Sequence, residues 1–299
     1  LESTDVPSSL QDSLMMRLDG LGRLRALASI AATIGRTFDV DLLRAVAETD
    51  DLDDELDQIV AAGVLVRAEG QSHRRLYTFG HALVREAAYH SITRRTRRQW
   101  HGRVADALAQ RPYAEATMVA HHLTEARRFA EAIDMWATAA RLDFANGTYD
   151  ECIANYDRGL ALIDELELEP EQVAAKEFEL RLGVGLAHAT RVGYAAAEAE
   201  QSYQRANELA QAFTGPEGFP AALGLWAYYQ VRSDAVQRRE LGVRCHALAQ
   251  LVDDASIRIE GPGSRREALA LTSLRSNSDF ISSIEKISWS PCDQPRRTR

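Results

Sequence analysis

His81 is the residue whose type and position in this chain best suit the binding of an anionic group. It lies between the alternating apolar residues of 77–79 and a following stretch whose apolar residues recur at helical spacing. A histidine at the start of a helix lies beside backbone N–H groups that have no intrahelical partner, and such groups bind anions. The sequence leaves two interpretations open: His81 contacts a phosphate, or it only caps the helix and packs against its neighbours.

A basic segment follows His81 and is the second candidate for binding chemistry. Its arginines lie close in sequence to Trp100 and His101. One interpretation is a contact patch for an acidic partner or a nucleotide phosphate, because guanidinium groups pair with both. The other is a solvated helix face whose arginine stems cover Trp100. The arginines of this basic patch are Arg94, Arg95, Arg97 and Arg98.

The motifs of phosphate-transfer and hydrolytic enzymes are absent from the sequence. The chain has two lysines, Lys176 and Lys286, and neither follows the glycine spacing of a P-loop, G-x-x-x-x-G-K-[ST]. The sequence also lacks G-x-S-x-G, H-E-x-x-H and G-x-G-x-x-G, and the glycines of Gly183–Ala187 lie inside a helical pattern, which indicates packing. We therefore predict no catalytic residues, no cofactor held by this chain and no ATP hydrolysis by the chain alone.

Histidines and cysteines do not predict a metal centre. His121 and His122 are adjacent, so on a helix their side chains point about 100° apart, and no third ligand is suitably spaced. Cys152, Cys245 and Cys292 are odd in number and far apart, without a C-x-x-C pair. This pattern fits a reducing cytoplasm and predicts neither a disulfide framework nor a zinc site.

Composition narrows the class of protein. The chain has 299 residues, 45% hydrophobic and 26% charged, as in a folded protein with two domains or one domain plus repeats. No apolar run is long enough for a membrane span and the first residues lack a signal peptide, so we expect a cytoplasmic protein. A net charge of −9 argues against nucleic-acid binding. The chain does not begin with Met, so we expect a piece of a longer protein.

Three helices and a hairpin are predicted in the first third of the chain, after a leading helix that opens with a capping box of Ser8 and Gln11. The strands are joined by a polar loop at 67–75. This content is that of a winged-helix module, which we place at 1–111. The expected helices cover 23–34, 40–47 and the stretch from the acidic 50–54 to 62, and the strands 64–66 and 76–79.

A winged helix often binds DNA, and this alternative is opposed by charge. The helix before the hairpin would enter the groove, and it is strongly acidic. Like charges facing DNA phosphates reduce affinity. We therefore favour a structural module over a DNA reader. The acidic residues concerned are Asp50, Asp51, Asp53, Asp54, Glu55 and Asp57.

From Glu115 onward the sequence predicts one helix after another with small residues at the contacts. The phrase R-F-A-E-A-I-x-x-W-x-x-A at 128–139 is similar to T-Y-D-E-C-I-x-x-Y-x-x-G at 148–159. Between them, Asn146-Gly147 ends one helix, and Thr148 with Glu151 predicts a capping box for the next. We place degenerate repeats at 112–255 and a serine-rich, loosely ordered tail, with one further helix, at 256–299.

Stacked helix pairs form a curved solenoid whose inner face binds peptides or other domains. Aromatic side chains of the repeats are candidates for such a partner-binding face. At helical spacing the same side chains also suit a core, and the sequence leaves both interpretations open. The residues are Trp136, Tyr156, Trp226 and Tyr229.

Several phrases together resemble the region that follows the ATPase core in large bacterial STAND/AAA-type proteins, some linked to adenylate or guanylate cyclase domains and some to LuxR-type regulators. By that resemblance a winged helix closes over ADP, tetratricopeptide-like repeats sense a partner, and His81 contacts the nucleotide phosphate. Gly80 and Ala82 stand where the family has Met and Asp. The phrases are V-P-S-S-L-Q-D-S-L-M-M-R-L-D at 6–19, G-R-T-F-D at 35–39, L-D-Q-I-V-A-A-G-V-L at 56–65, the His81 element, and A-H-H-L-T-E-A at 120–126.

The leading hypothesis is a mainly α protein, a winged-helix-like module followed by a degenerate tetratricopeptide-like α-solenoid. It would be the non-catalytic regulatory and interaction segment of a STAND-type ATPase with a cyclase or transcription-regulator output. Its partners would be an upstream ATPase domain or another protein bound by the repeats, and it would meet ADP or ATP only when joined to that ATPase. The alternatives are a DNA-binding winged-helix transcription regulator and a free-standing helical-repeat scaffold.

Overall fold

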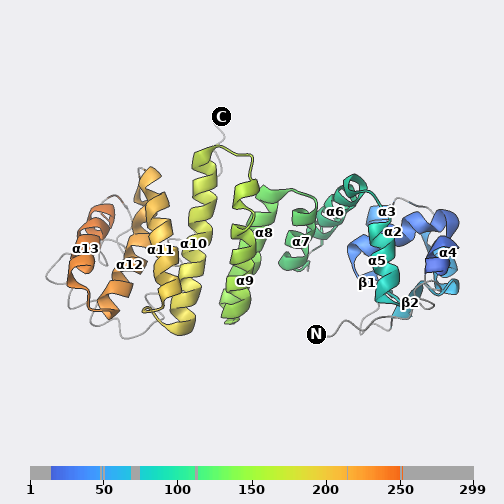
Figure 1. The fold of residues 1–299 in the computed structure, drawn as a ribbon, viewed down its shortest axis with the longest axis horizontal. Coiled ribbons are helices and arrows are strands. Elements are labelled where there is room, and N and C mark those ends of the chain that lie inside the picture. The colour runs from blue at the N-terminus through green and yellow to red at the C-terminus, as the bar shows by residue number, and fades with distance from the viewer. Residues whose placement is uncertain are drawn as a thin grey trace, which may run out of the picture. The chain divides into compact units, whose positions relative to one another are not determined.

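The computed structural model describes residues 15–47, 49, 51–68, 75–111, 114–213, 215–249 and 251. The chain divides into two compact units, Leu1–Met135 and Trp136–Arg299, and each is described by itself. Across the described ranges the chain is mainly helical with one small antiparallel sheet, which confirms the predicted fold class (Figure 1). The predicted capping box of Ser8 and Gln11 and the predicted tail at 256–299 lie outside the described residues.

The first helices of unit 1 follow the predicted pattern closely. A 3₁₀ turn, η1 (Gly22–Leu24), leads into α2 (Arg25–Ile34), and α3 (Val40–Ala47) and α4 (Leu52–Ala61) come next. The predicted inward face of α2 is buried, and the helix ends at Gly35, whose φ of 156° is accessible to glycine. Helix α3 has the predicted bounds because its apolar residues, cap and breaker agree.

The sheet of unit 1 has three strands instead of the two expected. Strands β2 (Leu65–Ala68) and β3 (Leu76–Phe79) form the predicted hairpin, and β1 (Thr37–Asp39) adds to the other edge of β3. All pairs are antiparallel, with Phe38 opposite Tyr77 and Leu65 opposite Phe79. Tyr77 and Phe79 are buried as their alternation predicts. Residues 69–74 of the predicted loop lie outside the described residues.

Three further helices complete unit 1: α5 (Ala82–His90), α6 (Arg94–Ala109) and α7 (Ala116–Glu125). Helix α5 packs on α2 and buries Val84 and Ala88. Of the apolar face that the sequence predicts, Leu83, Ala87 and Ala88, only Ala88 is fully buried. Helix α7 packs on α6, which draws it into unit 1. The compact unit therefore extends past the boundary predicted at residue 111.

Unit 2 is a stack of helices. Helix α8 (Phe129–Asn146) crosses the division between the units, and from α9 onward each helix packs on the next (Figure 1). Short 3₁₀ turns join several of them. This nearest-neighbour packing is the arrangement of a helical repeat region. The remaining helices are α9 (Tyr149–Leu160), α10 (Pro170–Val192), α11 (Ala197–Leu209), α12 (Phe219–Val231) and α13 (Ala235–Ala249).

The ends of these helices confirm one sequence prediction and correct another. Helix α8 ends at Asn146, and Gly147 follows with a φ of 77°, as the Asn-Gly pair predicts. The capping box predicted for Thr148 is wrong, because its hydroxyl donates to the Asp143 carbonyl at 3.1 Å. A capping box instead opens α10, where Glu169 and Gln172 bond reciprocally with the backbone.

Glycines of α10 admit tyrosine rings from both neighbouring helices. A Cβ at Gly183 would overlap the ring of Tyr156 from α9. A Cβ at Gly185 would lie 2.8 Å from the ring of Tyr203 from α11. The predicted packing role of these two glycines is confirmed. Tyr203 is 1% exposed and also lies against Gly224 of α12, so this one ring of α11 contacts both α10 and α12.

Candidate functional site

His81 is the N-cap residue of α5. Its backbone is extended, with φ −143° and ψ 138°, and its Nδ1 accepts a hydrogen bond from the Leu83 N–H at 3.2 Å. Strand β3 ends at Phe79, two residues before His81, and α5 begins directly after it. The hairpin and α5 together therefore position the His81 ring. His81 thus satisfies one of the N–H groups that a helix start leaves without an intrahelical partner.

The cap assigns the second ring nitrogen of His81 a chemical role. A nitrogen that accepts a hydrogen bond carries no proton, so the neutral ring holds its proton on Nε2. The half-buried imidazole can therefore cap the helix with Nδ1 and donate from Nε2 to an anion. Capping and phosphate contact, which the sequence presents as alternatives, are compatible in this geometry.

The arginines at the start of α6 do not form one uniform patch. Arg94, Arg95 and Arg98 are exposed, and none of them has an ion pair with another described residue. Arg97 instead turns to the protein, where its guanidinium carbon lies 4.4 Å from the centre of the Tyr89 ring. The exposed contact patch is thus reduced to three residues, and the fourth has a packing role.

His81 and this basic patch lie at opposite ends of α5 in the chain. His81 caps the start of the helix, and the arginines follow its end at His90. Nine helical residues span about 13 Å. One phosphate group is too small to contact both features, so they are separate candidate contacts.

A chain of hydrogen-bonded side chains runs from Tyr89 of α5 to two buried histidines of α6 and α7. The Tyr89 hydroxyl is 3.0 Å from Nε2 of His101, and Nδ1 of His101 is 2.8 Å from Nδ1 of His122. The His122 ring also bonds to the backbone carbonyl of Ile34 at the end of α2. Both histidines are 2% exposed. In the sequence His122 stands out only because it is adjacent to His121. Its hydrogen-bond partner in the structure is His101, which lies 21 residues earlier.

Burial keeps both of these imidazoles neutral. Desolvation, followed by the nearby His122 and His121 rings, lowers the pKa of His101 to about 3. Desolvation and the charge of His121 lower the pKa of His122 to about 4. Burial is also the main cause that raises the pKa of Tyr89. The network is therefore uncharged near neutral pH.

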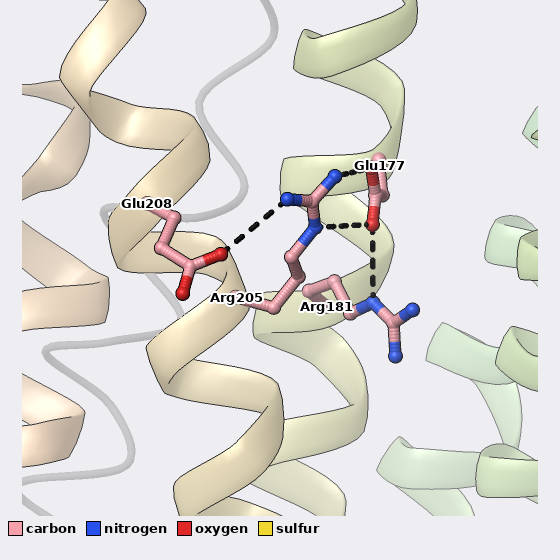
Figure 2. A network of polar contacts seen from close by, with 4 residues as sticks. All are labelled: Glu177, Arg181, Arg205 and Glu208. Carbon is pink, nitrogen blue, oxygen red and sulfur yellow. Dashed lines mark hydrogen bonds and ion pairs between the residues drawn. The ribbon is translucent and has the colours of Figure 1, made fainter.

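A charged network of different character joins α10 and α11 in unit 2 (Figure 2). The carboxylate of Glu177 accepts two hydrogen bonds from Arg205, at 2.9 and 2.8 Å, and a weaker one from Arg181 at 3.4 Å. Arg205 also contacts Glu208 on its own helix. The hydrogen bonds from Arg205 lower the pKa of Glu177. This bidentate pair holds neighbouring helices in register.

The aromatic residues of the expected partner-binding face separate into two groups. Trp136 and Tyr156 are 7% and 5% exposed and lie in the core of unit 2, so they offer no binding surface. Trp226 and Tyr229 of α12 are half-buried. The Tyr229 hydroxyl donates to Glu200 at 2.8 Å, which anchors it to α11. The expectation of a face built from all four residues is therefore corrected to the pair on α12.

Metal-binding geometry does not occur in the described parts of the chain, where no three histidine, cysteine or acidic side chains are arranged to hold an ion. Cys152 and Cys245 are buried thiols, and burial raises the pKa of each to about 12. Such thiols stay protonated and unreactive. Among the described helices none combines the length and apolarity needed to cross a membrane.

Comparison with known sequences gives one distant relative. No family model matches this chain. An uncharacterized protein of Rhizobium meliloti (strain 1021) is 25% identical over 229 residues, which is 73% of this chain and 22% of that protein. The chain therefore spans about a fifth of the length of the curated relative it matches.

Comparison with solved structures gives matches of low similarity. A Signal Transduction ATPase with Numerous Domains (STAND) protein with a tetratricopeptide repeat sensor from Pyrococcus horikoshii matches with 9% identity and a TM-score of 0.30, covering 89% of this chain and 50% of that one. BtubC from P. vanneervenii matches with 11% identity and a TM-score of 0.27, covering 96% of each chain. At these TM-scores neither match assigns a function.

Proposed function

We propose that this chain is a regulatory and interaction segment of a STAND-type signalling ATPase, without catalytic residues of its own. In this proposal unit 1 closes over ADP held by an upstream ATPase domain, and the helices of unit 2 bind the partner that releases the closure. The parent protein would carry a cyclase or a transcription regulator as its output. ADP or ATP would meet this chain only in the presence of that ATPase domain.

The geometry of His81 is the observation that carries the proposal. Its Nδ1 is occupied by the Leu83 N–H, so its Nε2 is the donor that remains for a phosphate oxygen. The position at a helix start adds the favourable field of the helix dipole for an anion. This supports a phosphate contact even though Gly80 and Ala82 replace the Met and Asp of the family resemblance.

The rival function as a DNA-binding regulator receives less support from the structure. Helix α4 precedes the hairpin and carries exposed acidic residues, among them Asp51, Asp54 and Asp57. Asp53 pairs with Arg44 and Arg75 from within the same unit, so two of the nearby cations are already engaged. An acidic helix in the groove-facing position opposes contact with DNA phosphates.

Titration of ADP against the chain joined to its upstream ATPase domain tests the proposal. His81→Asn keeps a side-chain oxygen that can cap α5 and replaces the Nε2 donor by an amide on a shorter side chain, which does not reach as far. His81→Ala removes both the cap and the donor. We expect both variants to weaken ADP binding about tenfold, the effect of one hydrogen bond to a charged group. The matched control is His90→Gln, an exposed histidine on the same helix.

The pair of variants separates the two roles of His81. If ADP affinity falls equally in both while only His81→Ala lowers stability, the phosphate contact is established. Unchanged affinity in His81→Asn would show that His81 only caps the helix. Unchanged affinity in both variants would favour a scaffold that does not respond to nucleotides.

A further inference from the structure

The half-buried Tyr89 and the buried His101 and His122 come from three different helices of unit 1, and their chain ends on a fourth. Tyr89 belongs to α5, His101 to α6 and His122 to α7, and the carbonyl that completes the chain belongs to Ile34 of α2. Helix α2 packs on α5 and on α6, and α6 packs on α7. The network thus connects the His81-bearing α5 with α6 and α7 through side chains.

One arrangement of protons satisfies every bond of the network. The ring of His122 donates to the Ile34 carbonyl, and since its Nδ1 faces His101, the donor is Nε2–H. The Nδ1 of His122 must then accept, so His101 donates from Nδ1–H. The Nε2 of His101 therefore accepts from the Tyr89 hydroxyl at 3.0 Å. Each neutral imidazole uses one donor and one acceptor, and neither has an unused polar atom.

We propose that Tyr89, His101 and His122 form a proton-sensitive relay that holds α5 against α6, α7 and α2 when neutral and releases these contacts when either imidazole takes up a proton. The proposal stands apart from the nucleotide contact of His81 and requires no ligand.

An added proton has no acceptable place in the closed network. On His122 it would occupy Nδ1, and His101 could accept it at 2.8 Å only by moving its own proton to Nε2, toward the Tyr89 hydroxyl. Whichever ring holds the added proton, the result is a cation among side chains that are 2% exposed at both histidines. A buried charge without a hydrogen-bonded counterion is strongly destabilising. Opening the helices relieves this conflict because it returns the imidazolium to water.

The charged groups around the relay do not provide that counterion. Arg97 of α6 lies over the Tyr89 ring and disfavours a positive charge on His101. His121 of α7 disfavours a positive charge on both imidazoles. On α5, Arg85 acts on Tyr89 and His90 contacts its ring. From α2 the Ile34 carbonyl acts on His122.

Glu125 of α7 is the carboxylate whose charge reaches this network, and it acts on Tyr89. Neither buried imidazole has an ion pair with another described residue. The relay is therefore arranged to stay closed as a neutral unit, with positive neighbours that amplify its response to acid.

Hydrogen exchange of the whole chain at pH 7.5 and pH 5.5 tests the release. A histidine that titrates near 6.5 only in the open form favours opening about tenfold for each pH unit below that value. With two such histidines, exchange corrected for its intrinsic pH dependence should rise about 100-fold in α5, α6 and α7. The helices α11 and α12, whose residues include no histidine, provide the internal reference.

Matched variants separate the relay from general acid sensitivity. His101→Gln and His122→Gln should each leave about a tenfold response, and the double variant should show none. Tyr89→Phe removes the hydroxyl but keeps both imidazoles, so it should keep the full response even if exchange is faster at pH 7.5. His246→Gln, an exposed histidine of α13, should behave as the unaltered chain.

Nitrogen NMR of histidine-labelled protein tests the same proposal without any substitution. We expect two imidazoles that stay neutral down to pH 5, one as the Nδ1–H tautomer and one as the Nε2–H tautomer. Two Nε2–H tautomers, or ordinary titration near pH 6.5 for all histidines, would overturn the relay. An acid response that persists in the double variant would also overturn it.

Discussion

The two units of this protein use opposite kinds of polar network to join their helices. The network of Tyr89, His101 and His122 in unit 1 is neutral and largely buried, and His101 and His122 are both 2% exposed. In unit 2 the network is charged and reaches solvent, since Arg205 is 45% exposed and Glu177 is 12% exposed. This difference indicates whether the stability of each unit depends on pH or on salt concentration. A buried neutral network responds to protons, and a solvated ion pair responds to salt.

Acid should produce the largest difference between the units. The pKa values of His101 and His122 lie below the ordinary value of 6.5, so the unfolded chain binds more protons. Their contribution to the stability of unit 1 is complete above pH 6.5 and is lost as the pH falls toward about 4. At pH 5.5 we expect a loss of about 3 kcal/mol.

Urea unfolding followed separately in each unit by hydrogen exchange measures this difference. Unit 2 should lose much less stability over the same pH range, because its network contains no buried histidine pair. Equal losses in both units would contradict the assignment of the acid response to the relay.

Gly183→Ala is the next largest expected effect and acts on unit 2 alone. Replacing glycine by alanine inside a helix normally stabilises it by about 1 kcal/mol. Here the new methyl group would overlap the buried Tyr156 ring, so we expect a net loss of about 2 kcal/mol.

Gly102→Ala is the matched control in unit 1, because a Cβ there would meet only the Ala126 Cβ at 3.9 Å. It should raise stability by about 0.5 kcal/mol or more. Chemical denaturation of both variants measures these changes in stability. A stabilising Gly183→Ala would show that the Tyr156 ring does not pack tightly against Gly183.

Arg111→Gln tests a charged pair that is less exposed than the one in unit 2. Arg111 forms two hydrogen bonds with Asp39, whose side chain is 13% exposed and also caps α3 through the Leu42 N–H. Because the carboxylate would be left partly buried without its cation, we expect a loss of about 1.5 kcal/mol from unit 1. Unfolding of the Asp39→Asn, Arg111→Gln double variant gives the coupling energy. A coupling near zero would reduce this pair to a surface contact.

Glu177→Gln should have the smallest effect. The bridge to Arg205 is half solvated, so we expect a loss of about 0.5–1 kcal/mol from unit 2 that shrinks in high salt. Thermal unfolding at low and high ionic strength measures it. The exposed pair of Arg67 and Asp57 in unit 1 is the control, and Asp57→Asn should change stability less.

Local sequence signals predicted the helices and the hairpin well. The bounds of α3 and the stop at Gly147 follow from residues within one turn of each other, where cap, apolar spacing and breaker agree. Strand β1 was not predicted because three residues are too few to show the alternation of apolar and polar side chains. Its pairing with β3 also depends on distant residues, since Thr37 pairs with Thr78, 41 positions away. The Thr148 cap failed because an acceptor on the preceding helix competes for the hydroxyl.

A site residue could be predicted only where its role depends on residues close to it in the sequence. His81 could be recognised because strand, cap and helix follow one another in the chain. The relay could not, since His101 and His122 meet only after α6 and α7 pack. The available signal was weak: a histidine in a basic helix and a histidine pair in the next. Burial of Trp136 and Tyr156 follows likewise from packing between helices.

The paired glycines of α10 limit how this protein can be divided. Gly183 and Gly185 face opposite ways around the helix, so α10 is thinned on both sides at one level to receive Tyr156 and Tyr203. If α10 were replaced by another helix without these glycines, neither tyrosine ring would have room to pack. If α9 or α11 were replaced, a cavity would remain beside the corresponding glycine of α10. Tyr203 also lies against Gly224 of α12, so the smallest set of helices that keeps these contacts is the four from α9 to α12. Adding or removing helices two at a time within this set would separate a tyrosine from its glycine.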